Sequence, residues 1–528
     1  MLLERLADTW AALGATRSRL AKRDLIVGVL ADLGGAGDPE DAADLEAVVS
    51  YLIGSLRQRR TGVGGRSLQD LPAPAATATL TVAEVHEAFE AVAGLSGPGS
   101  VATRAAAVGA LFARATAPEQ EFLRGLVFGE LRQGASEAAV QEALAVAYGV
   151  PVAAVRRAAM LRSSTVAAAA LLHTGGLEAL EQVGLAVGTP VQPMLAASEP
   201  DPAAAVARTG LPAMVDAKLD GIRVQVHRDG DEVHVYTRSL DEITNRLPEV
   251  VNAVRALPHD RLVLDGEVLA LRDDGRPEVF QAVASRAMSS LDVPAAERRL
   301  PLRPFFFDVL HADGRDFLDV PLHERAAAMA ELLPAGLLVP RVVTDDPAEV
   351  EAVFARWVAE GFEGVVVKKL DAPYAAGRRS SGWVKLKPRH TFDLVVTAVE
   401  WGHGRRQGWL SNLHLAARDP ERGFVMLGKT FKGLTDETLR WQTEHFLALE
   451  TSRTRGIVHV EPTTVVEIAI DGLQVSTRYP GGVALRFARV LRYRPDKSAE
   501  EADTLETVRA LSPVLPSDEA GPATGPED

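Results

Sequence analysis

The sequence contains no cysteine. The chain can therefore form neither a disulfide nor a zinc or iron–sulfur site built on thiolates. A bound metal would have to use oxygen or imidazole ligands. The twelve histidines show no paired helical spacing, so we assign no zinc site.

The chain also lacks long apolar runs. It has no stretch of about 18 consecutive apolar residues, the length that a membrane-spanning helix needs. The first 13 residues carry Glu4, Arg5 and Asp8 among their apolar positions, which is typical of an amphipathic helix and not of a secretory signal. We therefore expect a cytoplasmic protein that has no membrane partner.

Lysine is scarce, although basic residues are not. Only nine of the 57 basic residues are lysine, and eight of those nine follow residue 200. Because arginine keeps its proton, lysines in an arginine-rich chain are expected where an amine must act. The net charge of −14 argues against a nucleic-acid partner, but residues 498–528 alone contribute −7 of it.

The sequence divides into segments of different texture. Its 528 residues suggest about three or four domains at roughly 150 residues each. Helical spacing of apolar residues predicts an all-α domain over 1–184, and proline spacing predicts an extended linker over 185–210. Short strands with helices between them predict an α+β domain over 211–388, and strands predict a small β-barrel over 389–508. Residues 509–528 are expected to form a disordered acidic tail.

One lysine stands in a motif that can carry chemistry. Lys218 ends an apolar strand in the segment Ala-Lys-Leu-Asp-Gly-Ile-Arg (217–223), for which a hairpin with a surface lysine is the alternative interpretation. Downstream, Leu-Asp-Gly-Glu ends at Glu267, and Glu-Gly-Val-Val-Val-Lys joins Glu363 to Lys368. Two carboxylates are therefore expected to converge with several cations.

A cluster of positive charge follows these motifs. Strand alternation places Lys385 and Lys387 on the same face, and we interpret Trp383 on that strand as a packing residue. Residues 364–390 contain seven basic residues and one acidic residue, a net charge of +6. Such a segment favours a polyphosphate ligand.

In this order and spacing, the motifs resemble those of the covalent nucleotidyltransferase superfamily of ATP-dependent DNA ligases, RNA ligases and mRNA capping enzymes. The block 485–497 is similar to the last motif of that superfamily. The resemblance is closest to ATP-dependent DNA ligases of the archaeal and eukaryotic replicative type, which carry a helical DNA-binding domain ahead of the catalytic core. The arginine-rich and alanine-rich composition indicates an actinobacterial version.

This resemblance implies an all-α DNA-binding domain, an α+β nucleotidyltransferase (adenylation) domain and a C-terminal OB-fold β-barrel. Lys218 would be the catalytic nucleophile, which takes AMP from ATP and passes it to the 5′-phosphate of a nick, before the 3′-hydroxyl attacks and releases AMP. Glu267 and Glu363 would bind Mg²⁺. The residues implied to bind the nucleotide are Asp216, Arg223, Arg238, Glu267, Phe307, Lys368, Lys385, Lys387, Arg494 and Lys497.

The partners that the resemblance implies are ATP and nicked double-stranded DNA. A nick has no sequence to read, so we expect recognition of the DNA backbone. Arg132, in a segment similar to a helix-turn-helix stretch of the ligase DNA-binding domain, is a candidate contact, with a structural helical hairpin as the alternative. We expect a monomer and leave a sliding-clamp partner open.

Physical chemistry sets one condition on Lys218. Its amine must lose a proton before it attacks phosphorus, yet free lysine has a pKa of about 10.4. We expect neighbouring cationic side chains, together with a bound metal cation, to lower this pKa. The side chains are Arg238, Lys368, Lys385 and Lys387. Arg494 and Lys497 are expected to swing over the active site with the barrel, where they would orient the departing pyrophosphate.

Several alternatives remain open at this stage. Asp216 stands where many relatives carry glutamate for the adenine amino group, which leaves the nucleotide preference open. The rivals are an RNA ligase or a GTP-using capping enzyme and, in a different class, a catalytically dead DNA-binding scaffold. The helical first domain argues against the first two, and the intact motif set argues against the third. An NAD-dependent ligase would lack its usual cysteine zinc site.

Overall fold

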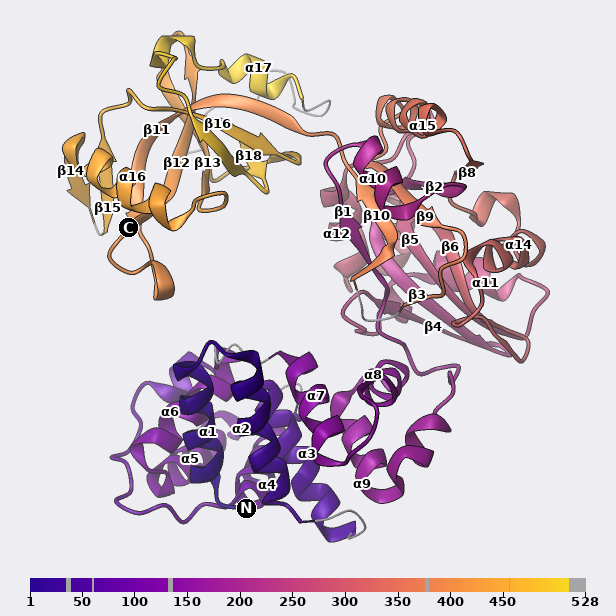
Figure 1. Cartoon of the computed structure of the whole chain (residues 1–528), viewed down its shortest axis with the longest axis vertical. Coiled ribbons are helices and arrows are strands. Elements are labelled where there is room, and N and C mark those ends of the chain that lie inside the picture. The colour runs from indigo at the N-terminus through magenta and orange to yellow at the C-terminus, as the bar shows by residue number, and fades with distance from the viewer. Residues whose placement is uncertain (35–38, 59–60, 132–135, 376–378, 455, 512–528) are drawn as a thin grey trace.

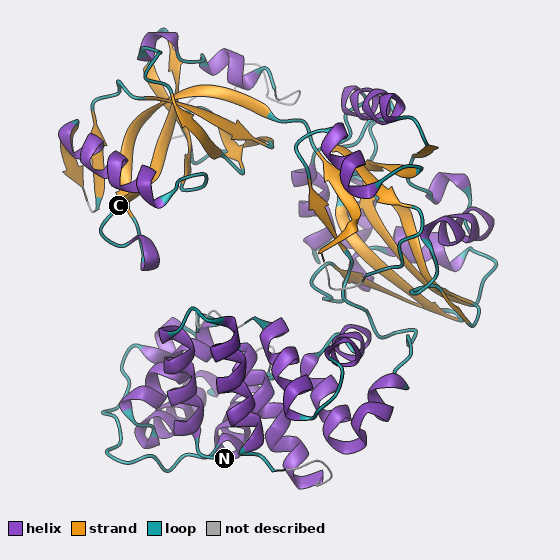
Figure 2. Cartoon of the chain, in the orientation of Figure 1, coloured by secondary structure: helices purple, strands orange, loops and turns teal. Residues whose placement is uncertain are grey.

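The computed structural model describes residues 1–34, 39–58, 61–131, 136–375, 379–454 and 456–511. In chain order these residues form a helical body, a body of mixed sheets and helices, and a sheet-rich body (Figures 1 and 2). Within the described ranges, no helix is long and apolar enough to cross a membrane.

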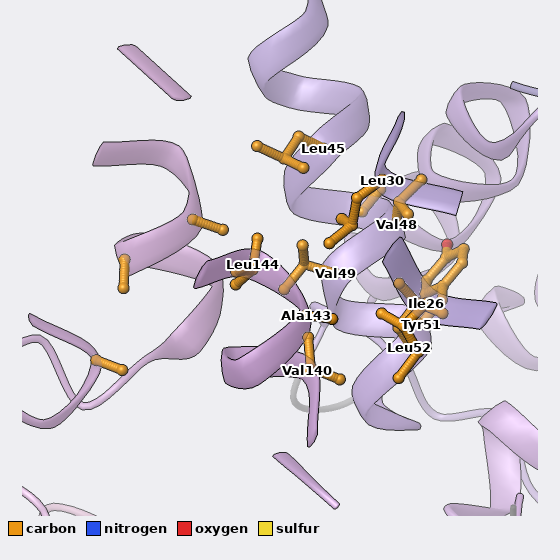
Figure 3. Packing of buried hydrophobic residues seen from close by; sticks show 14 of the residues in the cluster. Ile26, Leu30, Leu45, Val48, Val49, Tyr51, Leu52, Val140, Ala143 and Leu144 are labelled. Carbon is orange, nitrogen blue, oxygen red and sulfur yellow. The ribbon is translucent and has the colours of Figure 1, made fainter. Parts of the chain in front are cut away.

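The first body consists of helices, as the apolar spacing predicted. Their buried side chains meet where α2, α3 and α7 pack together, and Ile26, Val48 and Leu144 lie in this core (Figure 3). Thr81 and Thr116 begin α4 and α6 in capping boxes, each with a glutamate three residues later. The α-helices are α1 (Leu3–Ala15), α2 (Arg19–Ala31), α3 (Pro39–Ile53), α4 (Val82–Ala93), α5 (Ser100–Arg114), α6 (Ala117–Phe128), α7 (Glu137–Ala147), α8 (Val152–Leu161) and α9 (Thr165–Glu181).

Two sequence predictions fall on residues outside the described ranges. Arg132 is one of residues 132–135, and most of the expected acidic tail is residues 512–528. The tail was expected from residue 509, but α17 (Leu505–Arg509) still includes that residue.

The middle body contains two five-stranded sheets with a shared core between them. The first sheet has the order β1 (Leu195–Ser198), β10 (Arg379–Leu386), β9 (Gly364–Lys369), β2 (Ala213–Lys218), β8 (Arg341–Thr344). The second has the order β4 (Glu232–Thr237), β3 (Ile222–Asp229), β5 (Arg261–Leu269), β6 (Arg303–Ala312), β7 (Arg315–Asp316). The accompanying helices are α11 (Pro248–Arg255), α12 (Phe280–Met288), α13 (Val293–Arg299), α14 (Leu322–Leu332) and α15 (Pro347–Ala359).

The predicted linker over 185–210 is wrong for its second half. Leu195–Ser198 forms β1, which pairs in parallel with β10, and α10 (Pro202–Thr209) follows it. These elements belong to the first sheet of the middle body, so that body begins well before residue 211. A four-residue edge strand is too short to show a periodic pattern, and proline at the first turn of α10 resembles linker composition.

The first half of the predicted linker has no helix or strand but contains a turn at residues 187–188, and it is bound to the second sheet. Val191 exchanges two hydrogen bonds with the Gln225 side chain, at 2.7 and 3.0 Å. The Gly188 amide donates to His227 Nδ1 at 3.0 Å, and Tyr236 donates to the Gly188 carbonyl at 2.8 Å. Burial lowers the pKa of His227 to about 3, so its ring is a neutral acceptor here. The connection between the first two bodies is therefore fixed to β3 and β4.

The third body is built on one long strand, β11 (His390–Trp401). One edge of β11 pairs with β12 (Leu410–Asp419), while the other pairs first with β16 (Val465–Ile470) and then with β15 (Ile457–Val460). Because one edge serves two strands in succession, the sheet curls around its apolar core. The remaining elements are β13 (Gly423–Thr430), α16 (Asp436–Ala448), β14 (Glu450–Thr454), β17 (Gly472–Val475), β18 (Val483–Arg486), β19 (Arg489–Tyr493) and α17.

Candidate active site

A cavity of about 1990 Å³ lies between the middle and third bodies. It receives side chains from both sheets of the middle body and from one face of the third body. Ten of the residues proposed from the sequence line it, namely Asp216, Lys218, Arg223, Arg238, Glu267, Phe307, Glu363, Lys368, Lys385 and Lys387. The structure therefore gathers motifs that are spread over about 170 residues of chain into one place.

Close backbone approaches explain the glycines in two of these motifs. A Cβ on Gly221 would lie 2.3 Å from the Val268 carbonyl oxygen, so glycine lets the segment after Lys218 approach β5. Gly364 has φ +144° and pairs with Lys218 across β2 and β9, and a Cβ there would lie 2.0 Å from the Leu386 oxygen. The two glycines bring the carboxylates of the site to the end of β2.

Lys218 is paired with a carboxylate. Its Nζ lies 2.5 Å from Glu363 Oε2, and the Glu363 amide donates to the Lys218 carbonyl at 3.0 Å. Burial alone would lower the pKa of Lys218, but the negative charges of Glu363 and Glu267 outweigh it and raise the pKa above its ordinary value. The cationic side chains of the site therefore do not by themselves lower this pKa, and Lys218 is held as an ammonium in this structure.

The cations of the site are engaged by other groups. Lys387 binds Glu363 from the other side, and Lys368 binds Asp216 at 2.6 Å. Strand alternation had placed Lys385 and Lys387 on one face, and both line the cavity. Arg238 also lines it, from the segment that follows β4.

The second carboxylate, Glu267, is held in an unusual state. Burial raises the pKa of Glu267 to about 7, against the opposing effects of Lys218 and Arg223, and it accepts a hydrogen bond from the Gly221 amide at 3.3 Å. Among the described residues, no group of three or more histidine, aspartate or glutamate side chains forms a metal site. A pair of carboxylates suits Mg²⁺, which commonly takes one or two from the protein and completes its shell with water and substrate phosphates.

Aromatic rings line one end of the cavity. Phe307 and Trp383 pack edge to face with centroids 5.8 Å apart, and the Lys368 Nζ lies 4.3 Å from the Trp383 centroid and 5.0 Å from that of Phe307. Trp383 is almost fully buried, as a packing residue would be, but it also lines the cavity. A flat apolar ligand such as a nucleobase fits this end.

Arg223 lines the cavity but makes strong internal contacts. It forms a two-point pair with Asp265 at 3.0 and 2.7 Å and donates to the Met194 carbonyl at 2.7 Å. Tyr374 donates to the same aspartate at 2.6 Å. This network ties the segment before β1 to the second sheet, a structural role that the motif alone did not indicate.

Sequence reasoning missed one residue beside the site. Arg341, on β8, stands directly opposite Asp216 on β2 and binds both oxygens of its carboxylate at 2.8 Å. It lies in no recognisable motif, and only the pairing of β2 with β8 brings it to Asp216. No local sequence signal could have found it.

The structure brings only the first part of the last motif to the cavity, which is lined by Arg486, Phe487, Arg489 and Leu491 of the block 485–497. Arg494 and Lys497 both bind Asp393, with shortest distances of 2.9 and 2.6 Å, and neither lines the cavity. The third body instead presents Lys432, Arg486 and neighbouring residues. Arg486 reaches Asp220 of the middle body at 3.2 Å, which joins the two bodies beside Lys218.

Three family models match the chain. The model for the ATP dependent DNA ligase domain matches residues 193–387, and that for the ATP dependent DNA ligase C terminal region matches residues 406–497. A third, for the DNA ligase N terminus, matches residues 66–145. The first match begins ahead of β1, in agreement with the position of that strand in the first sheet.

Curated relatives align over nearly the whole chain. A protein of Nocardioides sp. (strain JS614), described as a probable DNA ligase, is 60% identical over 515 residues, which are 97% of this chain and 99% of that protein. A protein of Beutenbergia cavernae with the same description is 59% identical over 521 residues, 97% of this chain and 100% of that protein. A solved structure described as Pmar-Lig_PreS3 is similar in fold, with a TM-score of 0.59 and 18% identity over 93% of this chain and 99% of that one.

Proposed function

This chain belongs to the ATP-dependent DNA ligase family, and on that premise we propose that Lys218 is the nucleophile that carries AMP between ATP and nicked DNA. The enzyme seals nicks between 5′-phosphate and 3′-hydroxyl ends in duplex DNA at the expense of ATP. The observation that carries the assignment is the position of Lys218 in a cavity with two carboxylates and several cations.

The lysine must be freed before it can react. Lys218 is an ammonium bound to Glu363, so attack on the α-phosphate requires that it leave this carboxylate and lose a proton. Lys387 also binds Glu363 and keeps that carboxylate partly neutralised when Lys218 departs. Arginine could not replace Lys218, because a guanidinium keeps its proton at any pH at which the protein is folded.

The remaining residues divide between the base and the phosphates. We assign Phe307 to stacking on the base and Asp216 to its amino group, because both lie at the aromatic end of the cavity. Lys385, Lys387 and Arg238 would neutralise the phosphates as charge shifts onto pyrophosphate. Arg223 is assigned to holding the nucleotide end of the second sheet through Asp265.

The carboxylate pair fits a hard divalent cation. Glu267 and Glu363 would hold Mg²⁺, which when bound supplies positive charge to the phosphates of the nucleotide. Both are buried beside Lys218 and can offer oxygen ligands, and the chain has no cysteine to favour a softer metal.

The rest of the chain is assigned by the family. We assign the curled sheet to an OB-fold barrel, because β11 pairs with strands on both edges and the sheet curls around an apolar core. We assign DNA binding to the helical body, with Arg132 as a candidate contact to duplex DNA. Arg494 and Lys497 would act on pyrophosphate only after the barrel turns, since both are bound to Asp393 here. DNA and ATP as substrates would place a monomeric enzyme in the cytoplasm, where a sliding clamp is a candidate partner.

The test is a mass measurement on the full chain mixed with ATP and Mg²⁺. We expect one added AMP, mapped to Lys218, and its transfer to nicked DNA. An adduct from GTP but not ATP would favour a capping enzyme, and transfer to nicked RNA alone would favour an RNA ligase. No adduct from either nucleotide would favour a DNA-binding scaffold.

A further inference from the structure

The carboxylate at the base end of the cavity is held by three charged hydrogen bonds. Arg341 Nε binds Asp216 Oδ1 and Arg341 Nη2 binds Oδ2, each at 2.8 Å, while Lys368 Nζ lies 2.6 Å from Oδ2. Arg341 Nη2 and Lys368 Nζ also donate to the Phe307 carbonyl, at 3.1 and 3.3 Å. The carboxylate and the backbone of the stacking residue are thereby fixed to each other.

Strand geometry decides where this group points. Asp216 and Lys218 are two residues apart on β2, so their side chains project to the same side, roughly 7 Å apart along the strand. Both line the cavity, whereas Arg341 approaches Asp216 from the neighbouring strand and does not line it. Arg341 is therefore placed behind the carboxylate, out of reach of a ligand in the cavity.

The number of hydrogen bonds limits what the carboxylate can still accept. An ionised carboxylate offers about four lone-pair positions, two on each oxygen. The two on Oδ2 are used by Arg341 and Lys368, and one on Oδ1 is used by Arg341. One acceptor position remains, on Oδ1. Lys368 and Arg341 outweigh the effect of burial and hold the pKa of Asp216 below its ordinary value, so the group has no proton to donate.

This arrangement distinguishes between purines. A single acceptor suits the 6-amino group of adenine, which can donate one N–H to Asp216 and leave the other to water. Guanine presents a carbonyl oxygen at that position, which the carboxylate would repel, and its N1–H and 2-amino group need two acceptor positions side by side. A carboxylate with one free acceptor position on each oxygen could bind both of these guanine groups. Asp216 cannot, because Arg341 and Lys368 occupy both positions on Oδ2.

We propose that Arg341 is a positioning residue that makes Asp216 a one-acceptor contact and so sets the preference of this ligase for ATP. The inference rests on the proposed function, because it takes the cavity to be the nucleotide site. It also explains how an aspartate can serve at position 216, where many relatives carry the longer glutamate, because an arginine on the next strand holds the aspartate in place.

The first experiment uses the unaltered full chain and follows adduct formation from nucleotide analogues with Mg²⁺. Purine riboside triphosphate, which lacks the amino group, should raise KM by about tenfold with kcat nearly unchanged. N6-methyl-ATP keeps one N–H and should behave as ATP, while N6,N6-dimethyl-ATP should behave as the purine analogue. Equal use of ATP and the purine analogue would overturn the proposal.

The second experiment changes the arginine. Arg341→Lys keeps the charge but loses the two-point grip, so the preference for ATP over both the purine analogue and GTP should fall by about tenfold. Arg325→Lys is the matched control, because Arg325 makes the same two-point pair with Asp308, which is fully buried and does not line the cavity. The control should keep the preference of the original chain.

The outcomes separate this inference from the proposed function. No adduct on Lys218 from any nucleotide would defeat the proposed function. Normal adduct formation with an unchanged preference in Arg341→Lys would defeat the role of Arg341 alone. If Arg341→Lys does not fold, Arg341→Gln, which can still donate one hydrogen bond to Asp216, is measured in its place. An unchanged preference in Arg341→Gln would defeat the role of Arg341, and equal use of the analogues by the original chain would defeat the Asp216 contact on which that role depends.

Discussion

At the scale of single residues, the site is held in a resting state by ion pairs. Lys218 lies against Glu363, and Asp216 lies between Lys368 and Arg341. Each pair satisfies charges that would otherwise be buried alone, which is costly. The same pairs keep Lys218 protonated and Asp216 ionised, so the proposed chemistry at Lys218 would begin with the loss of its pair with Glu363.

Lys218→Ala should abolish lysyl-AMP formation and leave the affinity for nicked DNA nearly unchanged. The substitution removes the proposed nucleophile, while Glu363 keeps Lys387 as its partner and the fold of the site is expected to be retained. Adenylation by mass measurement and nick binding by fluorescence anisotropy check the two halves. Residual adduct at another residue would contradict the assignment.

Glu363→Gln should make the Lys218 amine reactive at lower pH. The Glu363 charge raises the pKa of Lys218, so removing it lowers that pKa and increases the unprotonated fraction at any given pH. Reductive methylation of the full chain, mapped by mass spectrometry across a pH series, measures the shift. The control is Glu360→Gln, at an exposed position, which should leave the pH profile of methylation unchanged. An unchanged profile in Glu363→Gln would show that the ion pair does not influence the pKa of Lys218.

At the scale of elements, the site depends on how closely three strands meet. The end of β2 lies beside the start of β9. The end of β10 pairs with β9 at the same place, where the Leu386 carbonyl approaches Gly364. Gly364 is the position at which no side chain can be accommodated. Lys218 and Glu267 are therefore carried on strands, and Glu363 and Lys387 lie directly beside strand ends, which hold them more rigidly than loops would.

Gly364→Ala should destabilise the middle body and reduce adenylation. Its Cβ would meet the Leu386 oxygen, and overpacking of this kind costs about 1–3 kcal/mol beyond the strain of the positive φ. Gly230→Ala, at a hairpin with φ +61° and open space around it, is the control and should lose only the strain energy, about 1–2 kcal/mol. The urea midpoint for loss of adenylation measures both. Equal midpoints would show that the close approach at Gly364 relaxes without cost.

At the scale of the whole molecule, the three bodies are joined by few polar contacts. Arg157 of α8 makes a two-point pair with Asp319 at 2.9 and 2.7 Å, and Arg486 of the third body reaches Asp220. The Arg157–Asp319 pair is exposed and contributes only about 0–1 kcal/mol. The Arg486–Asp220 pair is partly buried, and Lys387 also reaches Asp471 of the third body at 3.5 Å. The proposed role of the last motif requires the third body to break these contacts when it turns.

Lys497→Ala should impair adenylation more than the sealing of a preadenylated nick. The lysine would be needed only when pyrophosphate leaves, in the first step, and in this structure it is bound to Asp393 away from the cavity. Rates of lysyl-AMP formation and of sealing from adenylated DNA, measured on the same variant, give the comparison. Equal loss in both would contradict the assignment of the last motif.

Much of this enzyme could be inferred without a structure. The helical first body, the strand and helix texture of the second, and the positions of Lys218, Glu267 and Glu363 follow from local periodicity and from short motifs in a fixed order. Such signals are local, because the period of a helix or strand and the chemistry of a lysine beside a turn are contained in a few neighbouring residues. The error over 195–209 arose where a four-residue strand and a proline-initiated helix gave too little pattern.

The partners of those residues were decided by tertiary structure. Lys218 was expected among cations and lies against Glu363, and Asp216 is held by Arg341 from 125 positions further along the chain. Arg494 and Lys497 face Asp393 and not the nucleotide cavity. Strand pairing and the docking of separate bodies set these distances, and burial then sets which charges must neutralise each other. Neither strand pairing nor burial can be derived from the few residues that flank a position in the sequence. The protonation state of Lys218 therefore became known only from the folded chain.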